Sequence, residues 1–208
     1  MKKMRKWINT PLIAILVICL SLLFASCQPK PAEYESSESN TEEIFAANST
    51  VVHKSGVTLV ITPVEEMGIT GQAQDVDINE YRLTVTGLVK KTLSLSYEDI
   101  LSYQSITEIA VLNCPDFFVD VGVWTGVPLM NILQEAGLKS DATQVVFHSI
   151  DGYSRTMSLD HIESHSVFLA YKVNGLTLPP EHGYPLRVVD ESSDGNMWVK
   201  WLDKIEIK

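Results

Sequence analysis

Short hydrophobic runs that alternate with polar residues dominate the chain from about residue 51 to its end. In YRLTVTGLV, Leu83 and Val85 fall on one face of an extended chain, and Thr84 and Thr86 fall on the other. This period of two is typical of a strand with one buried face, so the segment is predicted to be a strand. Comparable patterns predict further strands in VTLVITPV, TQVVFHSI, SVFLAYKV, YPLRVVD and MWVKWLDKIEI.

Two short segments carry helix signals. In LSLSYEDILS, Ser96 suits an N-cap and is followed by Glu98 and Asp99 in the first turn. In PLMNILQEAGL, Pro128 suits the helix start and Gly137 suits the C-terminal cap. Because the helices are short and isolated between strands, with no βαβ rhythm, the predicted fold class is α+β, mixed and β-rich, in a single domain.

The first 26 residues have the pattern of an export signal. A charged head, KKMRK, precedes an apolar stretch from Leu12 to Phe24, which is shorter than the ~20 residues of a membrane span. The following LFASC resembles a bacterial lipobox. This resemblance implies that residues 1–26 are a lipoprotein signal peptide and that Cys27 carries lipid. The alternative is a signal peptide that is cut elsewhere or retained as an anchor. The lipoprotein interpretation places the protein in the cell envelope, lipid-anchored on the extracytoplasmic side of a bacterial membrane, and both interpretations place it outside the cytoplasm.

The segment that follows differs in composition from the rest of the chain. Residues 27–50 are rich in Glu, Ser, Asn and Thr and poor in hydrophobic residues. Such a segment buries too little apolar surface to offset its ordering entropy, so it is predicted to be an acidic disordered tether. The predicted folded part then comprises a strand extension over residues 51–80 and a main domain over residues 81–208.

Charge excludes one class of function. The 208 residues include 26 Asp and Glu against 16 Lys and Arg, which gives a net charge of −10. Removal of residues 1–26 would take four of those basic residues and no acid. Nucleic-acid binding requires clustered Lys and Arg, so no nucleic-acid partner is expected. A hydrophobic content of 45% is sufficient for a real core.

Cysteine usage singles out one residue. If Cys19 leaves with the signal and Cys27 carries lipid, Cys114 is the remaining thiol and has no intramolecular disulfide partner. Residue type alone leaves three roles open: a small buried hydrophobe, a nucleophile or a soft metal ligand.

Other candidate residues favour structural roles. His161 and His165 have i, i+4 spacing, but LDHIESH lacks the glutamate placement of HExxH and an obvious third ligand, which favours surface histidines over zinc. The segment DESSDGN, residues 190–196, lacks the alternate spacing of a calcium loop, which favours a solvated turn. The remaining candidates are predicted to be core or lid residues: Trp124, Trp198 and Trp201.

Six segments, read in order, give a more specific signal. They are YRLTVTGLVKKTLSLSYEDIL, VLNCPDFF, VWTGVPLMNILQEAGL, VVFHSIDGY, FLAYKVNGLTLPPEHGYPLRVV and GNMWVKWLDKIEI. Together they resemble the molybdopterin-binding domain of the sulfite oxidase and protein-methionine-sulfoxide reductase family. The most specific pieces are the lone Cys before WTGVPL, the DGY, and LPxxHGxPLR followed by VKW. The resemblance covers about residues 81–208 and implies a sulfite-oxidase-like fold.

The resemblance also implies site residues. It implies that the Cys114 thiolate binds molybdenum, which suits a soft ligand, and that this cysteine is catalytic. A buried terminal phosphate of the pterin would need Arg and Lys donors. Residue type alone would instead favour salt bridges of Arg187 and Lys200 with acids such as Asp190 or Asp203. The implied cofactor-binding residues are Ser149, His182, Arg187, Trp198, Val199 and Lys200.

The implied activity is two-electron oxygen-atom transfer on a small-molecule substrate by a lipid-anchored molybdopterin-dependent oxidoreductase. No C-x-x-C-H haem motif occurs, so an external electron carrier is expected. The approach to the cysteine contains Glu108, Asp116 and Asp120 and no Lys or Arg, which argues against sulfite and favours a neutral sulfoxide or another small oxo-acceptor. No match to the family's N-terminal pterin-holding residues is evident before Tyr81.

A second functional hypothesis comes from the export signal. Pterin is normally inserted in the cytoplasm, which requires export of a folded protein by the twin-arginine pathway. The sequence KKMRKW has no Arg-Arg pair and resembles a signal for unfolded chains. The alternative is therefore a cofactor-free lipoprotein that binds a ligand or partner on the same fold.

Overall fold

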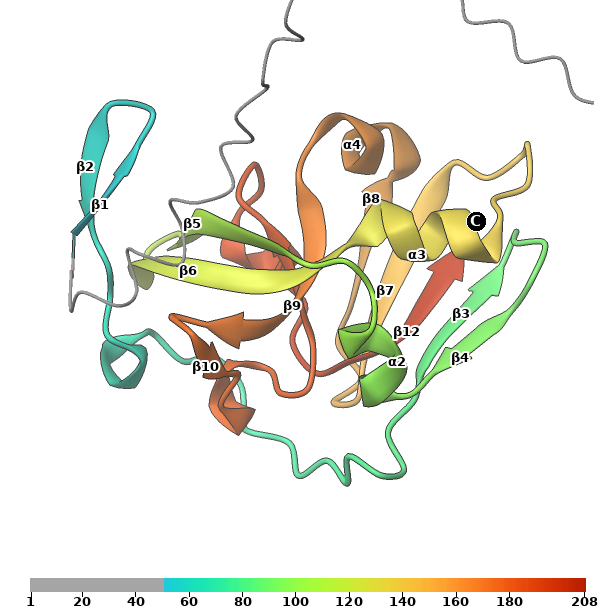
Figure 1. Ribbon diagram of the computed structural model, residues 1–208, viewed down its shortest axis with the longest axis horizontal. Helices are drawn as coiled ribbons and strands as arrows, with labels where there is room; N and C mark the ends of the chain where they lie inside the picture. The colour runs from blue at the N-terminus through green and yellow to red at the C-terminus, as the bar shows by residue number, and fades with distance from the viewer. Residues whose placement is uncertain (1–50) are drawn as a thin grey trace, which may run out of the picture. The chain divides into compact units, whose positions relative to one another are not determined.

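The structure, a computed structural model, describes residues 51–208 (Figure 1). The predicted signal peptide, the lipid site at Cys27 and the acidic tether lie outside the described residues and stay predictions. Within residues 51–208, no helix has the length and apolar character needed to cross a membrane.

The first large sheet is antiparallel and carries most of the segments that surround the site. Its strand order is β10-β9-β6-β5, and β11 also pairs with β9. The β5–β6 hairpin pairs without interruption from Ile106 opposite Gly126 to Cys114 opposite Phe118. The strands are β5 (Ile106–Cys114), β6 (Phe118–Pro128), β9 (Val167–Val173), β10 (Leu176–Thr177) and β11 (Arg187–Asp190).

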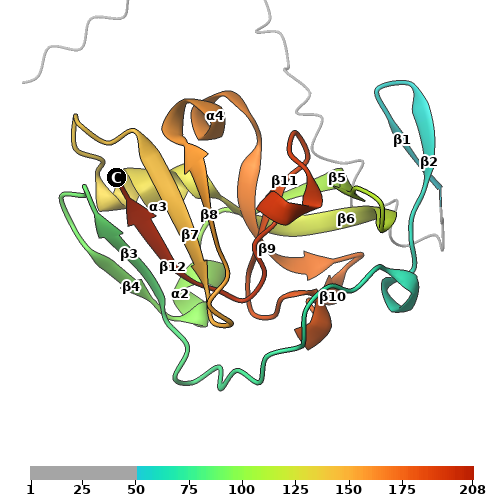
Figure 2. The ribbon, with the colours of Figure 1, turned by 180° about the vertical axis from the view of Figure 1, so that it is seen from behind.

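The second large sheet has the order β4-β3-β12-β7-β8 and lies beside the first (Figures 1 and 2). The C-terminal strand β12 is central, parallel to β3 and antiparallel to β7. The strands are β3 (Leu83–Gly87), β4 (Leu93–Leu95), β7 (Gln144–Ser149), β8 (Ser154–Ser158) and β12 (Leu202–Ile207).

Both predicted helices are present. Helix α2 (Tyr97–Leu101) begins with a capping box in which the Ser96 side chain accepts from the Asp99 N–H and Asp99 accepts from the Ser96 N–H. Helix α3 (Leu129–Ala136) follows Pro128 and ends at Gly137, whose φ of 68° suits glycine. The remaining short helices are α4 (Leu159–Ser164), η1 (Val64–Glu66), η2 (Pro180–His182) and η3 (Gly195–Met197).

Two hydrophobic clusters hold these elements together. The larger cluster joins α3 to the second sheet, with Leu83, Phe147 and Ile205 fully buried. The smaller cluster packs Trp124 of the first sheet and other side chains of that sheet against Trp198, which follows η3. The observed β-rich α+β fold confirms the predicted fold class.

One hairpin was missed, and two strand predictions need correction. The hairpin β5–β6 was not predicted, because many of its residues are half-buried on both faces and do not alternate cleanly. VTLVITPV is not one strand, since β2 (Val57–Val60) ends early and pairs with β1 (Val51–Lys54). In MWVKWLDKIEI only Leu202–Ile207 form a strand, because η3 and the positive φ of Trp201 bend the chain first.

Candidate functional site

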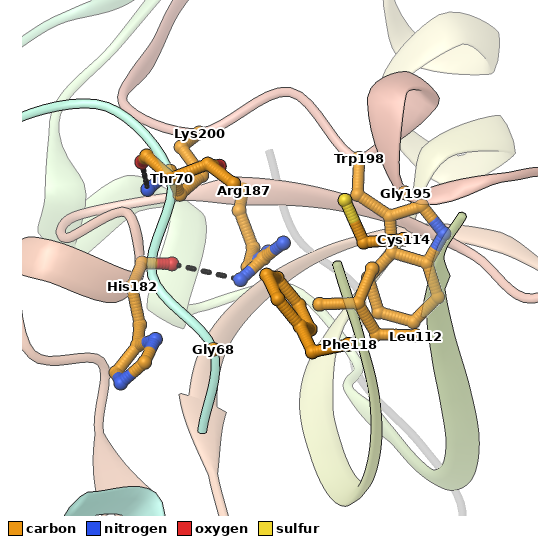
Figure 3. Close-up of a pocket in the computed structure, with 10 residues that line it drawn as sticks. All are labelled: Gly68, Thr70, Leu112, Cys114, Phe118, His182, Arg187, Gly195, Trp198 and Lys200. Atoms are coloured by element: carbon orange, nitrogen blue, oxygen red, sulfur yellow. Dashed lines mark hydrogen bonds between the residues drawn. The ribbon is translucent and has the colours of Figure 1, made fainter. Parts of the chain in front are cut away.

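A cleft lies where the end of β5 meets the segments on either side of β11. Its inner part has a volume of about 30 Å³ and its outer part about 300 Å³. Both parts are lined by Thr70, Cys114, Gly195, Trp198 and Lys200. The inner part adds Gly68, Leu112, Phe118, His182 and Arg187, and the outer part adds Gly71, Ser149, Asp151, Tyr153, Asn196 and Trp201 (Figure 3).

Cys114 is the last residue of β5 and is placed at the cleft by a tight turn. The Phe117 N–H donates to the Cys114 carbonyl at 3.0 Å, and Asp116 has a φ of 65°. Gly195 packs against this strand end, since a Cβ on it would lie 3.4 Å from the Cys114 Cα. Within residues 51–208, Cys114 is a free, half-buried thiol without a second cysteine. The thiol is therefore available to a ligand.

Arg187 is a buried cation at the bottom of the cleft. Its side chain donates to the His182 carbonyl at 3.1 Å, and its buried Nε has no hydrogen-bond partner among the described residues. The guanidinium lies 4.9 Å from the ring centre of Trp124 and 5.5 Å from that of Trp198. Burial lowers the pKa of Arg187 to about 10, and the charge of Asp120 opposes this shift. Among the described residues, no carboxylate forms an ion pair with Arg187, although the charge of Asp120 acts on it.

Lys200 and His182 extend the basic region. Lys200 donates to the carbonyls of Thr70 and of Glu181, the latter at 2.8 Å. Burial, and next the charge of Arg187, lower the pKa of Lys200 to about 8. The same two causes lower the pKa of His182. An anion in the inner cleft would relieve the repulsion between Arg187 and Lys200.

One glycine allows the basic side chains to converge. Gly183 has a φ of 110°, and a Cβ on it would lie 3.1 Å from the Lys200 Cβ and 3.2 Å from the Arg187 Cβ. Most residues could meet neither condition without strain. Figure 3 shows Arg187 and Lys200 on one side of the cleft, and Cys114 with Trp198 on the other.

Comparison with known proteins assigns this arrangement to a family. Residues 70–208 match the family described as the oxidoreductase molybdopterin binding domain. The chain belongs to this family.

Individual relatives support the assignment. The chain is 33% identical over 131 residues to the oxidoreductase YuiH of Bacillus subtilis, covering 62% of this chain and 66% of that protein. It is 28% identical over 217 residues to the sulfite oxidase of Arabidopsis thaliana, covering 86% and 55%. The sulfane dehydrogenase SoxCD from Paracoccus pantotrophus has the same fold, with a TM-score of 0.67 and 23% identity over 88% of this chain and 56% of that one. The chain thus spans 66% or less of each.

The molybdopterin-binding assignment allows the predicted site residues to be located. The cleft brings together Cys114 and five of the six residues predicted to bind the cofactor. The exception is Val199, whose side chain is packed in the larger core and whose carbonyl accepts from the Val188 N–H at 2.8 Å. The five that line the cleft are Ser149, His182, Arg187, Trp198 and Lys200.

These residues fit the cofactor chemically. The buried Ser149 hydroxyl and the Arg187 Nε lack partners among the described residues, and buried polar groups rarely remain unpaired. A phosphate would accept from such donors, and a thiolate from Cys114 is a suitable ligand for molybdenum. The outer cleft is at the lower end of the size range of small-molecule sites.

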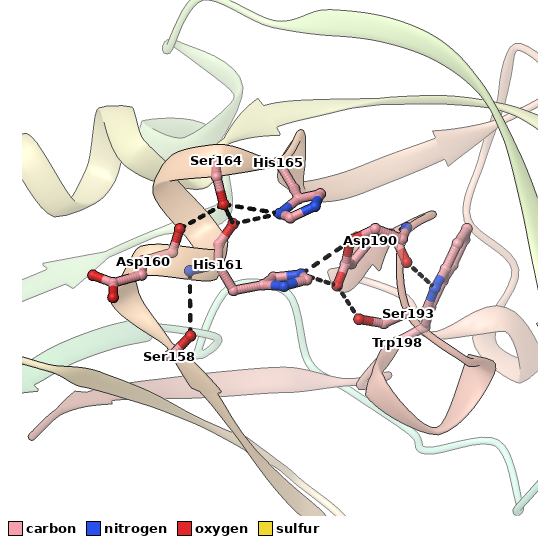
Figure 4. A network of polar contacts seen from close by, with 9 residues as sticks. Ser158, Asp160, His161, Ser164, His165, Asp190, Ser193 and Trp198 are labelled. Atoms are coloured by element: carbon pink, nitrogen blue, oxygen red, sulfur yellow. Dashed lines mark hydrogen bonds and ion pairs between the residues drawn. The ribbon is translucent and has the colours of Figure 1, made fainter.

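The salt bridges that residue type favours for Arg187 and Lys200 do not form. In the described part of the chain, no carboxylate lies within ion-pair distance of either cation. The Asp190 carboxylate instead accepts from Ser192 and Ser193 at 2.5 Å each and faces His161 at 2.9 Å (Figure 4). This acid is therefore satisfied by other partners.

The two histidines of LDHIESH have structural roles. Their rings stack with centroids 4.2 Å apart, and His161 pairs with the buried Asp190, a contact that the surface interpretation did not include. His165 remains exposed. Residues 51–208 contain no group of three or more acids, histidines or cysteines placed to hold a metal ion.

The acids that approach Cys114 in sequence do not all approach it in space. Glu108 accepts from Ser166 at 2.7 Å and lines a different pocket. Asp120 is buried and accepts from the Gly68 N–H. Only Asp116 remains exposed at the turn beside Cys114. The argument against sulfite therefore rests on Asp116 and on the lack of Lys and Arg along the hairpin, and it stays a prediction.

Several residues of the cleft were not predicted. Gly68, Thr70 and Gly71 come from the segment 51–80, in which no pterin-holding residue was evident. Only the glycines gave a signal, since Gly68 packs against the Phe118 ring and Gly71 against the Trp201 ring. Glycine can mark a close approach, but it does not identify the partner.

The low pKa of Lys200 makes anion binding sensitive to pH. Lys200 loses its charge as pH rises through about 8, so cofactor-free protein should bind sulfate about tenfold more weakly at pH 9.5 than at pH 7. Sulfate keeps its charge over this range, and calorimetric titration measures its affinity. In the Lys200→Arg variant, the loss of sulfate affinity between pH 7 and pH 9.5 should be much smaller. An equal loss in that variant would contradict the assignment of Lys200 to the anion site.

Proposed function

We propose that this chain is a lipid-anchored, extracytoplasmic molybdopterin-dependent oxidoreductase that carries out two-electron oxygen-atom transfer on a small substrate. The observation that carries the proposal is the cleft in which a free thiol, Cys114, faces two cations without a carboxylate partner, Arg187 and Lys200. Membership of the molybdopterin-binding family supports the same conclusion.

The basic end of the cleft would hold the terminal phosphate of the pterin. Arg187 can donate from several N–H groups in a fixed plane, and Lys200 adds a charge that can turn toward the ligand. The Arg187 guanidinium is largely shielded from water, because it lies beside the rings of Trp198 and Trp124, which are 2% and 0% exposed. Ionic hydrogen bonds are stronger in such surroundings than in bulk water.

At the other end, Cys114 would supply a thiolate to molybdenum. When bound, the cofactor provides the two-electron chemistry of oxygen-atom transfer. The protein contributes the position of the thiolate, because the turn after β5 is fixed by the Phe117 to Cys114 main-chain bond and by close packing of Gly195. Precise placement of this kind matters, since a misplacement of ~1 Å can cost a hundredfold in rate.

The substrate is proposed from charge, the membrane anchor from the N-terminal sequence, and the external electron carrier from the lack of a C-x-x-C-H motif in the sequence. The hairpin that carries Cys114 has no Lys or Arg from residue 104 to residue 128, so we favour a neutral sulfoxide or a similar oxo-acceptor over sulfite. Rates with sulfite and with a neutral sulfoxide would measure this preference. Lipid on Cys27 would hold the enzyme at the membrane, and electrons would pass to or from an external carrier.

The proposal is tested by the metal content of protein purified from its own host with its N-terminal segment intact. We expect about one molybdenum and one pterin per chain. A well-folded preparation without molybdenum would contradict the proposal and would support the cofactor-free binding module. The lipid anchor is tested separately by mass spectrometry of the mature N-terminus.

A further inference from the structure

The segment of residues 63–71, here called the strap, closes one side of the cleft. It leads from β2 past the end of β6 toward the second sheet (Figure 1). Its Thr70 carbonyl accepts from Lys200, and its Val64 carbonyl pairs with His182 Nε2 at 3.1 Å. Lys200, which is assigned to the cofactor phosphate, and His182, which is assigned to the cofactor, are thus hydrogen-bonded to the strap.

Asp120 holds the strap between these two contacts. Its carboxylate accepts from the Gly68 N–H at 2.9 Å, and Asp120 is only 4% exposed. A Cβ on Gly68 would lie 2.2 Å from the Phe118 ring, so the strap backbone rests directly on that ring. Asp120 and Phe118 lie on the same strand, β6, which therefore contacts the strap at two points.

Asp120 belongs to a small set of buried polar residues. Among the described residues, the other buried polar or charged residues are Ser149, His182, Arg187 and Asp190. The first three line the cleft, and Asp190 is satisfied by its serines and His161. Burial raises the pKa of Asp120, whereas the Gly68 hydrogen bond and the charges of His182 and Arg187 lower it. Burial of a carboxylate costs free energy unless the carboxylate is paired or hydrogen-bonded, so the contacts of Asp120 are significant.

We propose that Asp120 is a positioning residue of the cofactor site: through the Gly68 N–H it holds the strap in place, and the strap in turn positions Lys200 for the phosphate and fixes the His182 ring. This inference rests on the proposed function only for the identity of the anion. The hydrogen bonds that join Asp120, His182 and Lys200 to the strap are present whichever anion the cleft binds.

Two substitutions separate the hydrogen bond of Asp120 from its charge. Asp120→Asn keeps an acceptor for the Gly68 N–H and removes the negative charge, whereas Asp120→Ala removes both. Loss of the negative charge beside Arg187 by itself favours anions. Asp120→Asn should therefore bind sulfate at least as tightly as the wild type, and Asp120→Ala should bind it about tenfold more weakly than Asp120→Asn.

The experiment uses full-length protein in detergent, produced without molybdopterin, with sulfate as the probe at pH 7. Hydrogen exchange of the Gly68 amide reports strap docking directly. It should be about tenfold faster in Asp120→Ala and close to wild type in Asp120→Asn. Asp116→Asn is the matched control, because it makes the same charge change at an exposed position of the same hairpin.

The outcomes distinguish this inference from the proposed function. Equal Gly68 exchange in the wild type and Asp120→Ala, or equal sulfate affinity in Asp120→Ala and Asp120→Asn, would overturn the role of Asp120. If the wild type bound no sulfate, the phosphate site itself would be contradicted. Hydrogen exchange would then still decide whether Asp120 holds the strap.

Discussion

The Cys114→Ser variant is expected to lose at least about a hundredfold in turnover while its fold and thermal stability stay close to those of the wild type. Replacement of groups that merely support a metal ligand costs about 10–100-fold, so loss of the ligand itself should cost more. The fold should persist because the thiol is only half-buried and the turn hydrogen bond uses the Cys114 carbonyl. Steady-state turnover and circular dichroism measure the two effects.

A neighbouring residue provides the control for this substitution. Asn113 precedes Cys114 on β5 and is exposed, with its side chain directed to the opposite face of the strand. Asn113→Ser should therefore retain turnover. Normal turnover in Cys114→Ser would remove the basis for a catalytic thiolate.

The Arg187→Ala variant is expected to lose the cofactor during purification. Arg187 and the cofactor phosphate would form a buried, hydrogen-bonded charge pair. Removal of one partner of such a pair costs about 2–5 kcal/mol, which corresponds to at least roughly thirtyfold weaker cofactor retention. Arg187→Lys should be intermediate, since lysine keeps the charge but not the planar set of donors. Pterin and molybdenum per chain, measured after extended dialysis, give the result.

An exposed arginine serves as the control for Arg187. Arg82 donates to the main-chain carbonyls of Asn79 and Tyr81 and does not line the cleft. Arg82→Ala should keep its cofactor. Full retention in Arg187→Ala would show that the phosphate lies elsewhere.

Local signals in the sequence predict much of the fold. Ser96 and Asp99 form a complete capping box because that interaction involves only residues three apart. Leu83 and Val85 alternate with Thr84 and Thr86 because β3 has one buried face. The hairpin β5–β6 could not be found in this way, because Ile109 and Val111 on its other face are also half-buried and blur the period of two.

The site could be predicted only where motifs are contiguous. His182 and Arg187 lie within one short segment, whereas Asp120 and the strap reach the same cleft through contacts distant in sequence. Asp120 looks like a surface acid until the fold places the Gly68 N–H beside it. The separation of Asp190 from Arg187 likewise depends on how the 190–198 turn folds, which residue types do not specify.

The most direct test of the central claim is a count of the sulfur ligands of molybdenum by X-ray absorption spectroscopy, in the wild type and in Cys114→Ser. The dithiolene of the pterin and a protein thiolate should together give three sulfur ligands in the wild type. We predict that the count falls to two in the variant. A count of three in Cys114→Ser, or wild-type protein from its own host without molybdenum, would contradict the assignment of Cys114 as the metal ligand.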